Sequence, residues 1–333
     1  MGQQVVIFQN GKRSTDVSLQ ALRQGLQTQD ALLWLDIEGD PVESVKLLTE
    51  TFKLSRLMIE ALCEPLERAK FIEGPSTDEG ARIFSLVTHG LAYDEKIDEA
   101  DTPKLDIAFG ANFIITAHQT PFDWLTKLQQ SCRVGDGHEN IMGRGMPFLL
   151  HAILDALVDS YFPVLDTIDD VIDDLENVTV NDTSNAVQAR IFRIKRSLAL
   201  MRRVISPQVE VANSLAMRTG ALIPAEAEPY FADVRDHLVR AFEILDAYRD
   251  LMSGLLDVHL STVSNRLNTV MKQLAIIATI FMPITFVTGV FGQNFGHMPQ
   301  VENDAGYNFW LVLGFMALIT IVQLWYFHRR GWL

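Results

Sequence analysis

One face of the last long helical segment carries side chains suited to contact with a cation along its whole length. Steps of three or four residues place only polar or small side chains on this face, apart from two methionines. The face consists of Asp250, Ser253, Asp257, Ser261, Ser264, Asn268, Met271, Ala275, Ala278, Met282, Thr285, Gly289 and Gly292. Hydroxyl and amide oxygens in such a row line ion pathways, whereas small residues also form tight seams between helices. The pattern alone leaves both interpretations open.

The same segment contains a stretch suited to a membrane. Residues 274–291 and 309–327 contain no charged residue, and at ~1.5 Å per residue each spans roughly 27–30 Å, close to the hydrocarbon core of a bilayer. Lys272 precedes the first stretch, Arg329 and Arg330 follow the second, and the connection between them has no Lys or Arg. The positive-inside rule therefore predicts a two-helix transmembrane hairpin with both termini in the cytoplasm and the polar turn outside.

Pro283 interrupts the backbone hydrogen bonding of the first apolar stretch. Because proline has no N–H, the carbonyl oxygen of Thr279, one turn earlier, loses its usual donor. The sequence thus predicts either a tolerated kink or an additional oxygen that faces the pathway.

The composition of the 333-residue chain limits the classes of function that fit it. A net charge of −14 argues against nucleic-acid binding, which needs a basic surface. The sequence contains no phosphate-binding loop, nucleophile elbow or His/Cys cluster with ligand spacing, so we expect neither enzymatic activity nor a cofactor. The N-terminus resembles no signal peptide, and we expect the segment before the hairpin to remain on the cytoplasmic side of the inner (plasma) membrane.

Residues 1–146 have the pattern of a cytoplasmic α/β domain. Runs rich in β-branched and aromatic residues alternate with helical periodicity, and Gly110 begins a tight turn between the last two runs. The predicted strands lie at residues 5–8, 32–37, 83–88, 105–109 and 113–118. The sequence therefore predicts a mixed sheet with helices packed against it.

The middle of the chain, residues 147–229, has a helical pattern that ends in a linker. Eight acidic and no basic residues lie between Asp155 and Glu176, and six basic and no acidic residues lie between Arg190 and Arg203. A short polar turn separates the two segments, so we expect an antiparallel helical hairpin with complementary charged edges. An acidic surface that attracts cations is the alternative interpretation of the first segment.

A final helix is expected to run without interruption over residues 230–291. Its first part, residues 230–273, forms a stalk, and the remainder belongs to the transmembrane hairpin of residues 274–333. A helix of about 60 residues is not stable alone and needs lateral partners, so an oligomer is the expected state.

Several motifs resemble the CorA family of divalent-cation channels, which have two transmembrane helices and a Gly-Met-Asn motif. This chain carries Gly292-Gln293-Asn294 at the corresponding place. The other matching segments follow the order of the family and lie at residues 155–162, 230–237, 265–272, 280–286, 298–299 and 326–333. The resemblance covers nearly the whole chain.

The resemblance implies a homopentamer in a lipid bilayer, with a cytoplasmic α/β funnel and a pore lined by the first transmembrane helix. Asn294 in the external turn would receive the hydrated ion, with Gly292 allowing the tight turn and Gln293 between them. The residues implied to line the pore are Asn268, Met271, Leu274, Met282 and Thr285.

The resemblance also implies that the cytoplasmic part senses divalent metal ions. Asp233 matches an acidic position that binds a regulatory metal ion between subunits, with Asp94 as its expected partner. Asp257 is a further candidate for a regulatory site. Loss of the bound metal would let acidic surfaces repel one another and open the pore.

Two departures from the family pattern leave the transported ion open. Gln293 stands where the family has Met, and the neutral Gln300 stands where an acidic residue often follows the Met-Pro pair. We expect transport of Mg²⁺, with Co²⁺ and Ni²⁺ as further ions. A ZntB-like Zn²⁺ transporter, coupled to protons, is the alternative, and a non-conducting, membrane-anchored metal sensor is a second one.

Overall fold

The computed structural model describes residues 2–9, 12–15, 18–28, 30–65, 67–74, 82–134, 141–217, 223–292 and 305–332. The chain divides into two compact units, Met1–Leu256 and Asp257–Leu333. The boundary falls within one helix, α8 (Glu228–Gly292), which contributes residues to both units.

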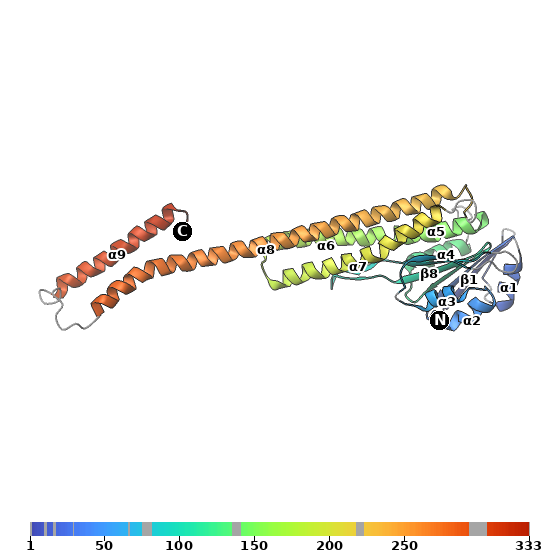
Figure 1. Cartoon of the computed structure of the whole chain (residues 1–333), viewed down its shortest axis with the longest axis horizontal. Coiled ribbons are helices and arrows are strands. Elements are labelled where there is room, and N and C mark those ends of the chain that lie inside the picture. Colours follow the sequence, from blue (N-terminus) through green and yellow to red (C-terminus); the bar gives the residue numbers. More distant parts are fainter. Residues whose placement is uncertain are drawn as a thin grey trace. The chain divides into compact units, whose positions relative to one another are not determined.

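A seven-stranded mixed sheet lies in the first unit (Figure 1). The strand order is β2-β1-β3-β9-β8-β5-β4; β3 and β9 run parallel, and the other neighbours run antiparallel. The strands are β1 (Gly2–Gln9), β2 (Lys12–Ser14), β3 (Ala31–Glu38), β4 (Lys70–Glu73), β5 (Phe84–His89), β8 (Lys104–Phe109) and β9 (Phe113–His118). The predicted mixed sheet is confirmed, and each of the five predicted strands overlaps an observed one.

Both faces of this sheet are buried because successive side chains along a strand point to opposite sides. Leu33 and Leu35 of β3 belong to the core shared with α1 (Leu19–Gln27), α2 (Val45–Glu50) and α3 (Arg56–Cys63). Leu32 and Trp34 belong to the core on the other face, which includes residues of the later helices. Short 3₁₀ turns, η1 (Pro41–Ser44) and η2 (Ile141–Arg144), join some of these elements.

The second face of the sheet is covered by long helices. These helices are α4 (Asp123–Val134), α5 (Met146–Asp159), α6 (Tyr161–Asn181), α7 (Asn185–Ala216) and the first part of α8. The turn between α6 and α7 lies where the sequence predicts it, and α8 spans the predicted uninterrupted helix.

Three arginines of α7 pair with partners outside α6. Arg190 and Arg193 bind Asp98, in the hairpin of β6 (Ala92–Asp94) and β7 (Glu99–Asp101), at 3.1 and 3.2 Å. Arg202 Nε lies 2.6 Å from Asp246 Oδ1 on α8. The predicted charge pairing between the two helices is therefore wrong for these arginines, because segments distant in sequence supply the carboxylates.

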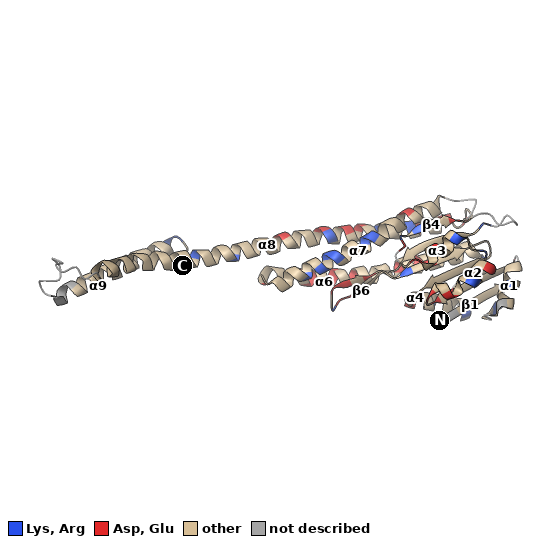
Figure 2. Cartoon of the chain, turned by 60° about the horizontal axis from the view of Figure 1, so that its bottom comes forward, with Lys and Arg blue, Asp and Glu red and all other residues tan. Residues whose placement is uncertain are grey.

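Three helical stretches are long and apolar enough to cross a membrane: Met146–Asn181, Glu228–Gly292 and Phe309–Arg329. In the most apolar 18-residue segment of Met146–Asn181, 44% of the residues are buried. The corresponding shares are 6% for Glu228–Gly292 and 0% for Phe309–Arg329, so α5 and α6 belong to the core of the first unit. The end of α8 and α9 (Ala305–Arg329) form the second unit, and Figure 2 shows few charged residues along α9. These exposed apolar surfaces coincide with the two stretches predicted to cross the membrane.

His89, at the end of β5, connects the sheet to the long helices. Its side chain is 6% exposed, and its main-chain oxygen accepts hydrogen bonds from Tyr161 Oη (2.5 Å) and Gln208 Nε2 (3.3 Å). Burial, and then the charge of Lys104, lowers the pKa of His89 to about 4. The imidazole is therefore neutral in the folded protein at physiological pH.

Replacing His89 with Gln should make the protein less sensitive to acid. Because the pKa of His89 is lowered from 6.5 to about 4 on folding, the stability that it contributes is fully present above pH 6.5 and is lost as the pH falls through this interval. The shift corresponds to up to about 3 kcal/mol. In thermal unfolding between about pH 7.5 and pH 4.5, the wild-type midpoint should fall more steeply than that of His89→Gln; parallel curves would contradict this assignment.

Candidate functional site

The five residues predicted to line a pore lie in the second unit and are exposed in the single chain. Met271, Leu274 and Met282 have 61%, 59% and 70% of their surface exposed, and Asn268 and Thr285 are also exposed. We call the surrounding face of α8 the polar stripe. It comprises Asn268, Met271, Ala275, Ala278, Met282, Thr285, Gly289 and Gly292.

Helix α9 packs against a different face of α8. Lys272 Nζ donates a hydrogen bond to the main-chain oxygen of Gly331 (3.1 Å), and Gln323 Nε2 donates one to that of Thr279 (3.1 Å). Ile276, one turn after Lys272, is only 6% exposed. With 3.6 residues per turn, this face lies about 100° around the helix from the polar stripe. The stripe is therefore not the seam between α8 and α9.

The side chain of Gln323 supplies a hydrogen-bond donor for the backbone carbonyl that Pro283 leaves without one. The carbonyl oxygen of Thr279, which Pro283 leaves without its helical donor, accepts the amide of Gln323. Its hydrogen bond thus goes to α9, and the predicted pathway-facing oxygen is wrong at this position. The other amide atom, Gln323 Oε1, is buried and has no hydrogen-bond partner in the part of the chain that the structure describes.

The turn that is predicted to be external lies largely outside the described residues. Gly292 is the last residue of α8, whereas Gln293 and Asn294 fall outside the ranges described. The role of Asn294 as the first contact of the incoming ion stays a prediction.

Three side chains of the first unit are placed to hold one metal ion. Asp155 and Asp159 lie one turn apart on α5, and His237 approaches them from α8, with one potential ligand atom of each within 4.8 Å of the others. His237 Nδ1 lies 3.6 Å from Asp159 Oδ1 and has no hydrogen-bond partner among the described residues. We call these residues the α5–α8 cluster.

Further titratable groups surround this cluster. Asp233, one turn before His237 on α8, places Oδ1 3.9 Å from His237 Nε2. Burial raises the pKa of Asp155 while His151 lowers it, and Asp159 and Asp233 add to the increase. A divalent cation would offset this repulsion between carboxylates, and the mixed oxygen and nitrogen donors suit ions such as Co²⁺, Ni²⁺ and Zn²⁺ as well as Mg²⁺.

The other two predicted regulatory residues lie elsewhere in the chain. Asp94 is exposed in β6, where its Oδ1 accepts a hydrogen bond from the main-chain N–H of Lys96 (2.9 Å). Asp257 is exposed at the start of the second unit. The structure thus surrounds Asp233 with residues of α5 and α8, and its predicted pairing with Asp94 of another subunit stays a prediction.

Comparison with known proteins identifies the family. A family model described as CorA-like Mg²⁺ transporter protein matches residues 29–329. The chain belongs to this CorA-like family. The Cobalt/magnesium transport protein CorA of Thermotoga maritima is 34% identical over 301 residues, covering 90% of this chain and 83% of that protein. The Zinc transport protein ZntB of Cronobacter sakazakii is 26% identical over 309 residues, covering 92% of this chain and 89% of that protein.

A solved structure shows the same fold. The CorA magnesium transporter from Methanocaldococcus jannaschii matches with a TM-score of 0.84 and 20% sequence identity, over 99% of this chain and 98% of that one. The CorA resemblance deduced from the sequence is thereby confirmed, as is the α/β domain followed by long helices.

The sequence analysis did not predict the α5–α8 cluster or the hydrogen bond from Gln323 to Thr279. Asp155 and Asp159, like Asp233 and His237, are spaced four residues apart, which places each pair on one helical face. That spacing was a usable signal, but it does not reveal that the two faces meet. Gln323 is the only amide side chain in residues 309–327, and its isolation in an apolar stretch was the second available signal.

Removing the amide of Gln323 should weaken the association of α8 with α9. In Gln323→Leu the carbonyl of Thr279 has no donor, and hydrogen bonds between membrane helices contribute about 0.6–1.7 kcal/mol. In Pro283→Ala the restored backbone N–H supplies a donor to the same carbonyl, so Gln323→Leu should cost less in that background. Unfolding of the four proteins of this double-mutant cycle in detergent measures the coupling. Equal losses in both backgrounds would show that the two residues act independently.

Proposed function

We propose that this protein is a divalent-cation channel of the plasma membrane, formed by several copies whose polar stripes surround a common pore. The observation that carries this proposal is the position of α9, which packs on another face of α8 and leaves the stripe uncovered. Polar groups in a bilayer need polar partners or water. Copies arranged around an axis supply both, and the CorA resemblance supports a homopentamer as the proposed assembly.

The chemistry of the polar stripe suits a hydrated ion. Asn268 and Thr285 offer neutral oxygens, and Ala275, Ala278 and Gly289 leave space between them. Mg²⁺ releases its water ligands reluctantly, so neutral side chains that bind those waters select the ion without trapping it. We therefore propose Mg²⁺ as the principal ion, with Co²⁺ and Ni²⁺ as further substrates. Asn294 is proposed to receive the ion at the external mouth.

The α5–α8 cluster is the proposed cytoplasmic sensor. A cation held by Asp155, Asp159 and His237 ties α5 to α8, and Asp233 extends the cluster toward solvent with 62% of its side chain exposed. Its exposure leaves it accessible to a neighbouring subunit. Loss of the cation restores repulsion between carboxylates and favours a second arrangement of α8. Because α8 also carries the polar stripe, this change acts on the pore.

A Zn²⁺ transporter is the second candidate. It is favoured by the imidazole in the α5–α8 cluster, by Gln293 in place of the family Met, and by the 26% identity to ZntB. A metal sensor that does not conduct is the remaining alternative, but a membrane anchor has no need of an uncovered polar stripe.

Ion flux into liposomes that contain the purified protein tests the proposal. Flux of Mg²⁺, Co²⁺, Ni²⁺ and Zn²⁺ should be ranked, and Asn294→Ala should reduce uptake. Thr285→Val should lower flux several-fold because it removes a hydroxyl from the stripe, whereas Thr279→Val is the matched control. Both threonines bond a carbonyl of their own helix, at 2.8 and 2.7 Å, but Thr279 lies on the face toward α9.

The outcomes of this experiment separate the three candidates. Mg²⁺ flux supports the leading proposal, and flux of Zn²⁺ alone supports the second. If none of the four ions is transported, the non-conducting metal sensor is the remaining candidate. Equal loss in Thr285→Val and Thr279→Val would contradict the assignment of the polar stripe to the pore.

Regulation is tested by flux against internal Mg²⁺ concentration. Asp233→Ala and His237→Gln should shift inhibition to severalfold higher internal concentrations, because each removes a cation contact of the cluster. Asp236→Ala is the control, since Asp236 is on the same turn but binds Arg235 (2.8 Å) instead. An inhibition curve unchanged in both variants would exclude the α5–α8 cluster as the sensor.

A further inference from the structure

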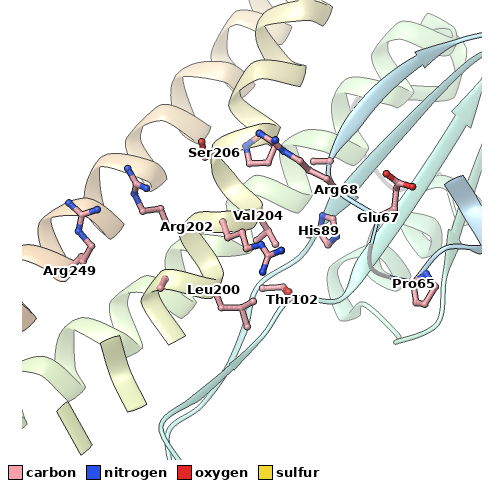
Figure 3. A pocket seen from close by; sticks show the side chains of 14 residues that line it. Pro65, Glu67, Arg68, His89, Thr102, Leu200, Arg202, Val204, Ser206 and Arg249 are labelled. Atoms are coloured by element: carbon pink, nitrogen blue, oxygen red, sulfur yellow. The ribbon is translucent and has the colours of Figure 1, made fainter. Parts of the chain in front are cut away.

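A basic cavity lies in the first unit, on the side of α7 that faces the sheet and α8. Its volume is about 720 Å³, within the range of ligand pockets. Figure 3 shows Arg68 reaching toward α7 from the segment before β4, with Arg202 and Arg249 contributed by α7 and α8. Arg203 and His89 also line the cavity. None of these residues belongs to the polar stripe or to the α5–α8 cluster.

Two of the four guanidinium groups are left without a carboxylate. Arg202 and Arg249 share Asp246, with N–O distances of 2.6 and 3.4 Å. Within the described ranges, Arg68 and Arg203 have neither an ion pair nor a hydrogen bond. The cavity's one acidic lining residue, Glu67, is paired with Lys70 (2.9 Å) and so does not neutralise them. The cavity thus retains an excess of positive charge in a chain whose net charge is −14.

His89 supplies an independent polar group at the wall. It is 94% buried, and its Nδ1 has no hydrogen-bond partner among the described residues. An unpartnered buried nitrogen is uncommon in folded proteins. Because Nδ1 itself is inaccessible, His89 contributes to the wall of the cavity, and the arginines are the groups that can contact a ligand.

We propose that this cavity binds a soluble phosphate-bearing anion between α7 and the sheet. Guanidinium groups bind phosphate oxygens in pairs of parallel hydrogen bonds, which makes arginine the preferred residue for such anions. The excess charge from Arg68 and Arg203 matches a dianion, and the volume leaves room for more than one phosphate group. A nucleoside phosphate or pyrophosphate fits these requirements. The site goes beyond cation transport and does not depend on it.

Isothermal titration of the full-length protein in detergent, freed of divalent metals on a chelating resin, tests this site. Pyrophosphate and ATP are the probes, and sulfate at equal ionic strength reports general attraction of anions. Arg68→Gln and Arg203→Gln should each weaken binding of the probes at least tenfold, and Arg203→Lys should give an intermediate loss. Arg196→Gln is the matched control, because Arg196 is exposed on the same face of α7 two turns earlier and does not line the cavity.

Each outcome decides the proposal. Selective loss in the Arg68 and Arg203 variants, with Arg196→Gln unchanged, supports it. The absence of binding by both probes overturns it, as do equal effects of all three glutamine variants or sulfate binding of equal strength. Glycerol 3-phosphate serves as a lipid-headgroup probe, and tighter binding of this probe than of pyrophosphate would overturn the assignment to a soluble anion. Because binding is measured directly, the result is independent of whether the protein conducts ions.

Discussion

The constraint on which the proposed assembly depends is the cost of leaving polar groups in hydrocarbon without partners. Helix α8 carries a row of small and polar side chains, and α9, the only other described helix of the second unit, packs about 100° away from it. A single chain in a bilayer would expose Thr285 to lipid, with a carbonyl of its own helix as the partner of its hydroxyl. Copies of the chain, with water between them, would relieve this cost, so the proposed pore and the proposed oligomer rest on the same stripe.

The same constraint operates on a smaller scale at Pro283. The proline removes one backbone donor, and Gln323 returns one from the neighbouring helix at 3.1 Å. An apolar residue at position 323 would leave the Thr279 carbonyl unsatisfied, whereas without the proline that carbonyl would already have its helical donor and would depend less on Gln323. The two residues are therefore physically complementary although they lie 40 positions apart in the chain. This contact also explains why α9 adopts its particular face of α8.

Local patterns predicted the elements of this fold well, because periodicity and turn residues act over short distances. The hairpin of β8 and β9, the turn between α6 and α7, and the uninterrupted α8 all follow from such patterns. Predictions that needed a partner distant in sequence fared worse. Charge complementarity suggested α6 as the partner of Arg190, whereas Asp98 of a short β-hairpin binds it at 3.1 Å. His237 and Asp159 were each visible on a helical face, but only the packing of α5 on α8 brings them together.

Acidic and basic side chains gather at two different positions along the part of α8 that belongs to the first unit. The α5–α8 cluster gathers two carboxylates of α5 and one imidazole of α8, and the basic cavity includes Arg249, twelve residues after His237 on the same helix. At ~1.5 Å per residue the two sites are roughly 18 Å apart along α8. A cation at the first, as proposed, would join α8 to α5, and an anion at the second would join α8 to α7 and the sheet. Both proposed sites therefore act on the part of α8 that belongs to the first unit, and ligands of opposite charge would stabilise its packing on different neighbours.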